Sequence, residues 1–304
     1  MAVTSHTAPL TADQATKLRS ILERDGFEFV ERDHTEFAGR KGKLNVSVYR
    51  KGPKVLVQGG GTEDFVKFTL EPEVLGEARL GYERVHQPDM FEPHFGIDES
   101  GKGDYFGPLV IAGVYTDDES TQKLLDQGIM DSKRITSARR IRVLAELIRN
   151  TPNTSHSIVA IGPEKYNELH TSFGNVNRLL AWGHARVIAR LHEQRPDCPR
   201  ALSDQFARPE VLAKALKAQR IDIKLEQRTK AESDVAVAAA SILARERFVD
   251  WIEKTSAASG IDLPLGASEA VVEAGRQLIA RHGEGSLVKA AKYHFRTTGK
   301  IVEK

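Results

Sequence analysis

The stretch that most constrains the fold is residues 95–108, in which acids, glycines and a lysine stand between two apolar runs. The residues before the acids alternate like a strand that enters a core, and residues 109–115 form a second β-rich run. Asp98 and Glu99 therefore lie at a strand end, where adjacent side chains point to opposite faces unless the backbone bends. The glycines that follow them allow such a bend.

Residues 96–102 also match the G-x-x-x-x-G-K pattern of a nucleotide-binding loop. That loop needs Ser or Thr after the lysine to hold magnesium, but Gly103 follows Lys102 here. Asp98 and Glu99 would also place carboxylates where phosphates must lie, so a nucleotide-binding loop is disfavoured. Adjacent carboxylates at a strand end suit hard divalent cations, which prefer oxygen ligands. A solvated acidic turn is the alternative if these residues stood alone.

The length of 304 residues predicts one or two domains. No apolar run is long enough to span a membrane, and the N-terminus lacks the basic and then apolar pattern of a secretory signal. Cys198 is the only cysteine, which excludes an intrachain disulfide and a thiolate metal site and favours a reducing, cytoplasmic setting. The net charge of +2 says little about nucleic acid by itself.

The residue pattern in the first part of the chain predicts a compact unit of helix, sheet and helix. Residues 11–14 form a capping box, which begins a helix that ends near Gly26. A further helix is expected from Thr62 to Pro72. Strand-like runs separated by turn residues lie between these helices, at 27–31, 44–49 and 54–58. Glycine and proline signals in residues 73–92 indicate a linker.

Basic residues gather across the predicted hairpin of this first part, with no acid between them. On a sheet they could form one basic face for a phosphate backbone. A solvated sheet edge that lysines protect from strand pairing is an equally good interpretation from the residues alone. The residues are Arg40, Lys41, Lys43, Arg50, Lys51 and Lys54.

Two later segments bring acids to the ends of predicted elements. Residues 200–206 form a short strand that carries Asp204 near its end, which repeats the arrangement of Asp98. Residues 229–234 lead into an alanine-rich helix at 235–251, and Asp234 lies near its N-terminus, where the helix dipole stabilises a carboxylate. A capping role is therefore the alternative to a catalytic role for Asp234.

Strands and helices alternate through this second part, which predicts a mixed α/β sheet. His184, on one of these helices, is expected to pack rather than to catalyse. The basic and aromatic tail from residue 288 onward, which includes Lys292 and Lys304, is expected to contact nucleic acid, with a solvated terminal helix as the alternative. Further strands are expected at 155–161 and 221–226, and helices after Thr136 or Ser137 and at 177–192, 211–217 and 269–282.

The run D-E-S-G-K-G-D-Y-F-G-P at 98–108 resembles the signature of ribonuclease HIII, a type 2 ribonuclease H. The D-S-K at 131–133 and the K-A-E-S-D run with the following A-A-A-S-I-L-A-R resemble later motifs of the same family. The lysine in the glycine turn and the Y-F-G-P ending favour this family over its sister, ribonuclease HII, which has an arginine in the turn. The resemblance covers the catalytic two thirds of the chain, and the N-terminal match rests on the order of elements.

The resemblance implies an α/β architecture, with an RNase H-like mixed sheet flanked by helices over residues 86–304. It also implies a small N-terminal α+β substrate-binding domain over residues 1–85 that resembles the TATA-box-binding-protein fold. The implied function is an endoribonuclease that hydrolyses the RNA strand of RNA/DNA hybrids by two-metal-ion catalysis with Mg²⁺ or Mn²⁺, leaving 3′-hydroxyl and 5′-phosphate ends. A monomer without membrane attachment is expected.

Two alternatives to this function stay open. One is the activity of ribonuclease HII at single ribonucleotides embedded in duplex DNA. The other is a hybrid-binding protein without catalysis, although a binder has no need for several spaced acids whose charge would repel phosphate.

The resemblance also implies the site residues. The catalytic and metal-binding acids are Asp98, Glu99, Asp204 and Asp234, and converging carboxylates of this kind repel one another unless cations lie between them. Substrate contacts are expected from Ser100, Gly101, Lys102 and Gly103, because a glycine turn exposes backbone groups that can reach the 2′-hydroxyl of RNA. Further phosphate contacts are expected from Lys133 and Lys230, and from Arg40, Lys41, Lys43, Arg50 and Lys51.

Overall fold

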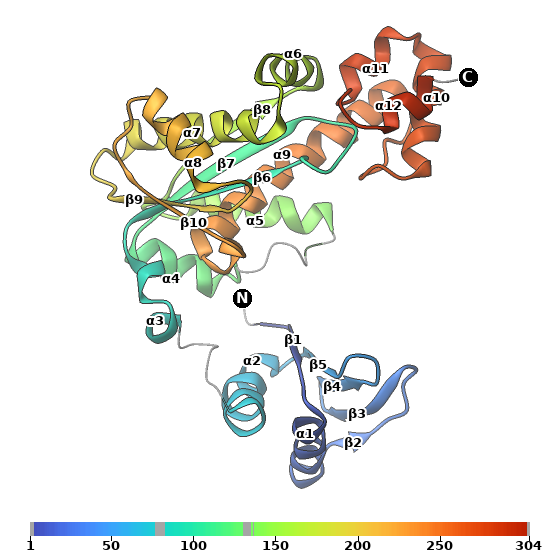
Figure 1. Ribbon diagram of the computed structural model, residues 1–304. Coiled ribbons are helices and arrows are strands. Elements are labelled where there is room, and N and C mark those ends of the chain that lie inside the picture. The colour runs from blue at the N-terminus through green and yellow to red at the C-terminus, as the bar shows by residue number, and fades with distance from the viewer. Residues whose placement is uncertain (1–2, 77–82, 130–134, 136, 303–304) are drawn as a thin grey trace. The chain divides into compact units, whose positions relative to one another are not determined.

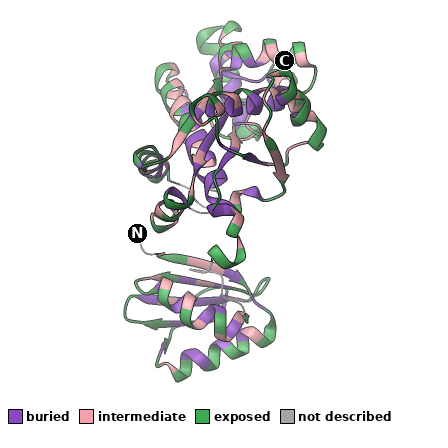
Figure 2. Cartoon of the chain, turned by 90° about the vertical axis from the view of Figure 1, so that its left-hand side faces the viewer, coloured by how far each residue is buried: buried purple, intermediate pink, exposed green. Residues whose placement is uncertain are grey.

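The computed structural model describes residues 3–76, 83–129, 135 and 137–302. Its contacts divide the chain into two compact units, Met1–Asp89 with Asp126–Gly128 and Met90–Leu125 with Ile129–Lys304 (Figure 1). Each unit has its own five-stranded sheet and its own hydrophobic core. In Figure 2 the buried residues gather inside each unit and the exposed residues lie on the outer sides of its helices.

The first unit is built on an antiparallel sheet in the order β1-β5-β4-β3-β2. Helix α1 and the helical segments after β5 supply apolar side chains, among them Leu18, Leu22 and Phe65, that pack against Val46 and Val57 of the sheet. The elements are β1 (Ser5–Pro9), α1 (Ala12–Arg24), β2 (Glu28–Phe29), β3 (Thr35–Lys41), β4 (Leu44–Tyr49), β5 (Lys54–Gly59), α2 (Thr62–Phe65), η1 (Val66–Leu75) and α3 (Glu83–His86).

The structure confirms the predicted capping box, since the Thr11 side chain accepts from the Gln14 backbone and the Gln14 side chain accepts from the Thr11 backbone. It also confirms the strands at 44–49 and 54–58. Two strands, β1 and β3, were not predicted from the sequence. The helical segment does not end at Pro72, because η1 continues through that residue to Leu75 with π-type geometry.

The second unit is built on a mixed sheet in the order β10-β9-β6-β7-β8. β6 (His94–Ser100) pairs antiparallel with β7 (Leu109–Thr116), which pairs antiparallel with β8 (Ser155–Ile161). On its other side β6 pairs in parallel with β9 (Arg200–Asp204), which pairs in parallel with β10 (Lys224–Arg228). The carboxyl ends of β6, β9 and β10 therefore lie at one edge of the sheet.

Two long helices cover the two faces of this sheet (Figure 1). α9 (Val235–Ser259) packs on β6 and β7 through its alanine-rich face, and α7 (Val176–Gln194) packs on the opposite face. Gly96 explains how close α9 lies, because a Cβ there would come within 2.2 Å of the backbone of Ala236 and Val237. Small residues on both elements thus let the helix lie directly on the strand that carries Asp98.

Shorter helices complete the second unit. The strand predicted at 221–226 lies further along the chain, since β10 spans Lys224–Arg228. The alanine-rich helix, expected at 235–251, continues to Ser259. The remaining elements are η2 (Pro88–Phe91), which crosses from the first unit, α4 (Asp118–Asp126), α5 (Ala138–Asn150), α6 (Pro163–Phe173), α8 (Pro209–Ala218), η4 (Ala231–Ser233), α10 (Glu269–His282), α11 (Gly285–Ala290) and α12 (Thr297–Val302).

Candidate active site

The two adjacent acids of β6 point to opposite faces of the sheet. The strand continues in register with β7 through Ser100, so the backbone does not bend at Asp98 or Glu99. The Asp98 side chain meets Ser241 of α9, whereas the Glu99 side chain meets His184 of α7. The strand alternation that the sequence predicts is kept, and the two carboxylates reach the site from different sides of β6.

Asp98 lies among groups that disfavour its charge. Burial, together with the nearby charges of Glu99 and Asp204, raises its pKa to about 7. Hydrogen bonds from Ser241 and from the Glu99 backbone N–H, at 2.8 Å, lower the pKa and only partly offset this effect. The clustering of carboxylates at this strand end therefore costs free energy unless a proton or another cation neutralises Asp98.

Glu99 is stabilised as a carboxylate. Burial raises its pKa, but a hydrogen bond and charge from His184 and the charge of Lys102 outweigh burial, so the pKa lies below its usual range. The His184 Nε2 atom lies 3.2 Å from Glu99 Oε2, and the Lys102 Nζ atom lies 3.6 Å from Glu99 Oε1. Each carboxylate oxygen thus faces its own donor.

His184 is a site residue that the sequence did not reveal. It is fully buried on α7, as the packing interpretation expected, but its ring joins two of the acidic segments. Its Nδ1 atom lies 3.1 Å from the Ser203 hydroxyl oxygen, which lies 3.0 Å from the Asp204 carbonyl oxygen. Helical spacing could show that His184 faces the core, but no sequence pattern pairs it with Glu99.

Asp204 ends β9 next to Asp98. Ile97 is paired with Ser203 in the parallel ladder, so the residues that follow each of them, Asp98 and Asp204, lie at the same sheet edge. The Asp204 Oδ1 atom accepts a hydrogen bond of 3.2 Å from the backbone N–H of Ala231 in η4. The predicted pairing of strand-end acids is therefore present for Asp98 and Asp204.

The structure does not bring Asp234 to these acids. Its Oδ1 atom caps α9 by accepting from the N–H groups of Ala236 and Val237, at 2.9 and 3.3 Å. Both of its carboxylate oxygens lie 3.0 Å from Nε2 of His94, at the beginning of β6. Since a strand rises about 3.3 Å per residue, that position is roughly 13 Å from Asp98 along β6. In this conformation Asp234 has the capping role that the sequence left as the alternative.

The glycine turn after β6 is packed at its base and open at its tip. Gly101 has φ +88°, and a Cβ there would meet the Pro108 carbonyl oxygen at 2.2 Å and the Phe248 ring at 2.9 Å. A Cβ on Gly103 would meet no atom within 4 Å. Ser100 is half-buried and Lys102 is partly exposed, so the expected substrate-contacting turn lies beside Glu99 and leaves its tip accessible.

Lys292 corrects the expectation that the whole basic tail contacts nucleic acid. Its side chain is fully buried, and its Nζ atom donates to the carbonyl oxygens of Asp104, Phe106 and Gly107 at 2.9, 3.3 and 2.6 Å. Burial lowers its pKa to about 7, and the charge of Asp104 offsets part of this effect. Lys292 therefore holds the loop that follows the glycine turn, while Lys304 lies outside the described residues.

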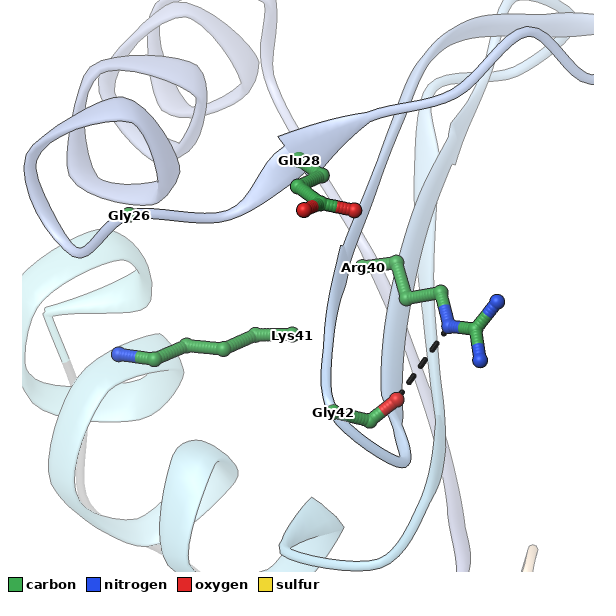
Figure 3. Close-up of a pocket in the computed structure, with 5 residues that line it drawn as sticks. All are labelled: Gly26, Glu28, Arg40, Lys41 and Gly42. Carbon is green, nitrogen blue, oxygen red and sulfur yellow. Dashed lines mark hydrogen bonds between the residues drawn. The ribbon is translucent and has the colours of Figure 1, made fainter.

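The basic residues of the first unit do not form one face. Arg40 and Lys41 are neighbours on β3, and their side chains point to opposite sides of the strand (Figure 3). Arg40 Nε donates to the Gly42 carbonyl oxygen at 3.3 Å, and Lys41 Nζ donates to the Asp25 carbonyl oxygen at 2.7 Å. Together with Gly26 and Glu28 they line a pocket of about 430 Å³. Arg50 and Lys51 lie at the opposite end of β4 from Lys43. Strand alternation and turn positions thus divide the cluster, and of the two interpretations that the sequence left open, one continuous basic face is not formed.

The two remaining expected phosphate contacts lie in the second unit. Lys230 is exposed in the turn after β10, with a left-handed backbone at φ 59°. It directly precedes η4, whose first residue, Ala231, is hydrogen-bonded to Asp204. Lys133 falls outside the residues that the structure describes.

The donor set at the sheet edge suits a hard divalent cation, because Asp98, Glu99 and Asp204 supply only carboxylate oxygens. Burial, with the charges of Glu99 and Asp204, also raises the pKa of Asp98. Among the described residues, no three His, Cys, Asp or Glu side chains are close enough together to hold a metal ion as they stand. Protein groups occupy each carboxylate: Ser241 at Asp98, His184 and Lys102 at Glu99, and Ala231 at Asp204.

No helix in the described part of the chain is long and apolar enough to cross a membrane.

A family model described as ribonuclease HII matches residues 95–298. The chain is 43% identical over 290 residues to a ribonuclease HIII of Protochlamydia amoebophila, covering 95% of this chain and 94% of that protein. It is 42% identical over 294 residues to a ribonuclease HIII of Chlamydia pneumoniae, covering 96% of each. The crystal structure of Bst-RNase HIII in complex with Mn²⁺ is similar over 98% of each chain, with a TM-score of 0.67 and 28% identity.

Proposed function

The chain belongs to the ribonuclease HIII family and is a ribonuclease H, and from this we propose that it cuts the RNA strand of RNA/DNA hybrids. Asp98, Glu99 and Asp204 are its proposed catalytic acids. One observation carries the proposal. These carboxylates lie at the carboxyl ends of the neighbouring strands β6 and β9, and the glycine turn follows β6 directly. A substrate that contacts the turn would therefore bring its phosphate to the acids.

Asp98, Glu99 and Asp204 would hold Mg²⁺ or Mn²⁺, the second of which is bound in the Bst-RNase HIII structure. Two divalent cations held there would supply the activation of a water molecule and the stabilisation of the departing 3′ oxygen, and the products would carry 3′-hydroxyl and 5′-phosphate ends. The raised pKa of Asp98 supports this assignment, since burial and the charges of Glu99 and Asp204 disfavour the carboxylate form, which a divalent cation would stabilise. His184 orients Glu99 through the Nε2 contact, and Lys292 fixes the loop that follows the turn.

Recognition of RNA paired with DNA is assigned to the turn at Ser100, Gly101, Lys102 and Gly103, because only the 2′-hydroxyl distinguishes the RNA strand at a given site. Lys230 is proposed as a phosphate contact at the same sheet edge. We assign residues 86–304 to catalysis and residues 1–85 to substrate binding, as a domain similar to the TATA-box-binding-protein fold. In that domain Arg40, Lys41 and Lys43 would contact phosphates separately from Arg50 and Lys51.

A nucleic-acid substrate supports the expected cytoplasmic location.

The substrate is tested with two labelled duplexes, one with a continuous RNA strand against DNA and one with a single ribonucleotide in duplex DNA. We expect cleavage of the continuous hybrid with Mg²⁺ or Mn²⁺ and none with chelator. The kcat/KM for the continuous hybrid should exceed that for the single ribonucleotide by about tenfold or more. Equal or faster cleavage at the single ribonucleotide would instead support the ribonuclease HII-like activity, and binding without cleavage under either metal would contradict the catalytic assignment.

The stability of the metal-free protein should depend on pH through Asp98. Its pKa is about 7 in the folded protein and near 3.8 when the chain is unfolded, so the folded state binds the extra proton between these values. Stability from this group is therefore present at low pH and lost as the pH rises through about 7. In chelator, the melting temperature of the wild type should fall between pH 5.5 and 8 by about 2–4 °C more than that of Asp98→Asn, in which the other titrating groups are unchanged. Parallel curves for the two proteins would show that Asp98 is not destabilised by its neighbours.

A further inference from the structure

The Glu99 carboxylate lies between two donors of different character. On one side is His184, which is fully buried and packed within α7. On the other side is Lys102, whose side chain is 38% exposed and stands between two glycines. One donor is fixed by the core, whereas the other belongs to a turn with an open tip.

Lys102 is held in this position by two weak contacts. Its Nζ atom lies 3.6 Å from Glu99 Oε1 and 5.7 Å from the centre of the Phe206 ring. The Phe206 ring in turn lies 4.7 Å from the His184 ring. The Lys102 side chain of the pair is 38% exposed while the Glu99 side chain is 11% exposed, and ion pairs and cation–π contacts with an exposed member contribute about 0.2–1 kcal/mol each. The ammonium group therefore has a defined resting place that it can leave at small cost.

The same carboxylate is a proposed metal ligand, and this creates a competition. An ammonium group and a divalent cation at one carboxylate repel each other. The attraction between Lys102 and Glu99 is therefore weaker once the metal ion binds. We propose that Lys102 is an exchangeable counter-ion of Glu99: it occupies the carboxylate in the free protein and moves to a substrate phosphate when a divalent cation takes its place. This inference rests on the proposed metal-binding role of Glu99.

The exchange couples metal binding to substrate binding. A metal ion releases Lys102, and the released ammonium group becomes available to the phosphate backbone. Because coupling between two binding sites is reciprocal, substrate that captures Lys102 also frees Glu99 for the metal. Lys102 thus weakens metal binding in the free protein and strengthens substrate binding in the metal-loaded protein.

These two effects have opposite signs in one variant, Lys102→Met. Isothermal titration of the free variant should show Mn²⁺ binding about two- to fivefold tighter than in the wild type, the range of an exposed ion pair. At saturating Mn²⁺ the KM for an RNA/DNA hybrid should instead rise severalfold. A side chain that only maintained the shape of the turn would weaken both kinds of binding when removed.

Lys165→Met is the control, because Lys165 likewise forms an ion pair three residues away in the chain, with Glu168, and its loss changes the net charge equally. It should leave both quantities unchanged. Lys102→Arg keeps the cation and should keep Mn²⁺ affinity near that of the wild type.

The inference is overturned if Lys102→Met binds Mn²⁺ no more tightly than the wild type, or if Lys165→Met gains the same affinity. Asp98→Asn separates this failure from failure of the proposed function. A wild type that binds Mn²⁺ through Asp98 without a gain in Lys102→Met would refute the exchange alone. A wild type whose Mn²⁺ affinity does not depend on Asp98 would refute the metal site and the exchange together.

Discussion

Asp98→Asn is expected to lower the rate of hybrid cleavage by about 10³-fold or more, while binding of the hybrid in chelator stays within about threefold. Asparagine has nearly the same shape, and its side-chain oxygen can still accept the hydrogen bond that the Glu99 backbone N–H gives to Asp98. It lacks the negative charge that makes a carboxylate a good ligand for a divalent cation. The chemical step should therefore be lost without loss of the folded structure. Single-turnover cleavage at saturating Mg²⁺ and fluorescence anisotropy in chelator measure the two quantities.

Asp262→Asn provides the control for this substitution, because Asp262 is an exposed acid in the segment before α10. It should cleave at the wild-type rate. A cleavage rate of Asp98→Asn within about tenfold of the wild type would mean that this carboxylate does not hold the catalytic metal.

The sequence predicted those elements whose own residues carry a strong local pattern. The alternation in β4, the apolar run in β7 and the cap of α1 are of this kind, and the structure has them at or within a residue of the expected bounds. β1 and β3 lack such patterns. β1 contains His6 and Thr7 and becomes a strand by pairing with β5, and β3 carries Glu36, Gly39 and Arg40. Tertiary pairing, which no local window contains, decides these strands.

The candidate site shows the same division. The sequence placed Asp98, Glu99 and Asp204 at strand ends, and the parallel pairing of β6 with β9 brings Asp98 and Asp204 together. It could not show which carboxylates would be taken by partners distant in sequence. His94 and Asp234 are 140 residues apart, and His184 and Glu99 are 85 residues apart. Such contacts depend on how α9 and α7 lie on the sheet.

The fourth acid of the site is the point at which the structure changes the expectation most. Asp234 is buried, caps α9 and faces His94. Glu232, two residues earlier in the same K-A-E-S-D run, is half-buried in η4, and the residue before it donates its backbone N–H to Asp204. We therefore propose Glu232, rather than Asp234, as the acid that joins Asp98, Glu99 and Asp204.

A pair of acid-to-amide substitutions tests this assignment. On this assignment, Glu232→Gln should lower the rate of hybrid cleavage by about 10²-fold, because one of the acids of the site loses its charge. Asp234→Asn should cleave within about tenfold of the wild type, since asparagine is also a good N-cap. It should instead lower the free energy of unfolding by about 1–2 kcal/mol, because the charge that stabilises the helix N-terminus and faces His94 is lost. Single-turnover cleavage and denaturant unfolding of both variants separate the two roles. If Asp234→Asn loses cleavage while its unfolding midpoint is unchanged and Glu232→Gln remains active, Asp234 is the catalytic acid and must leave His94 when the metal binds.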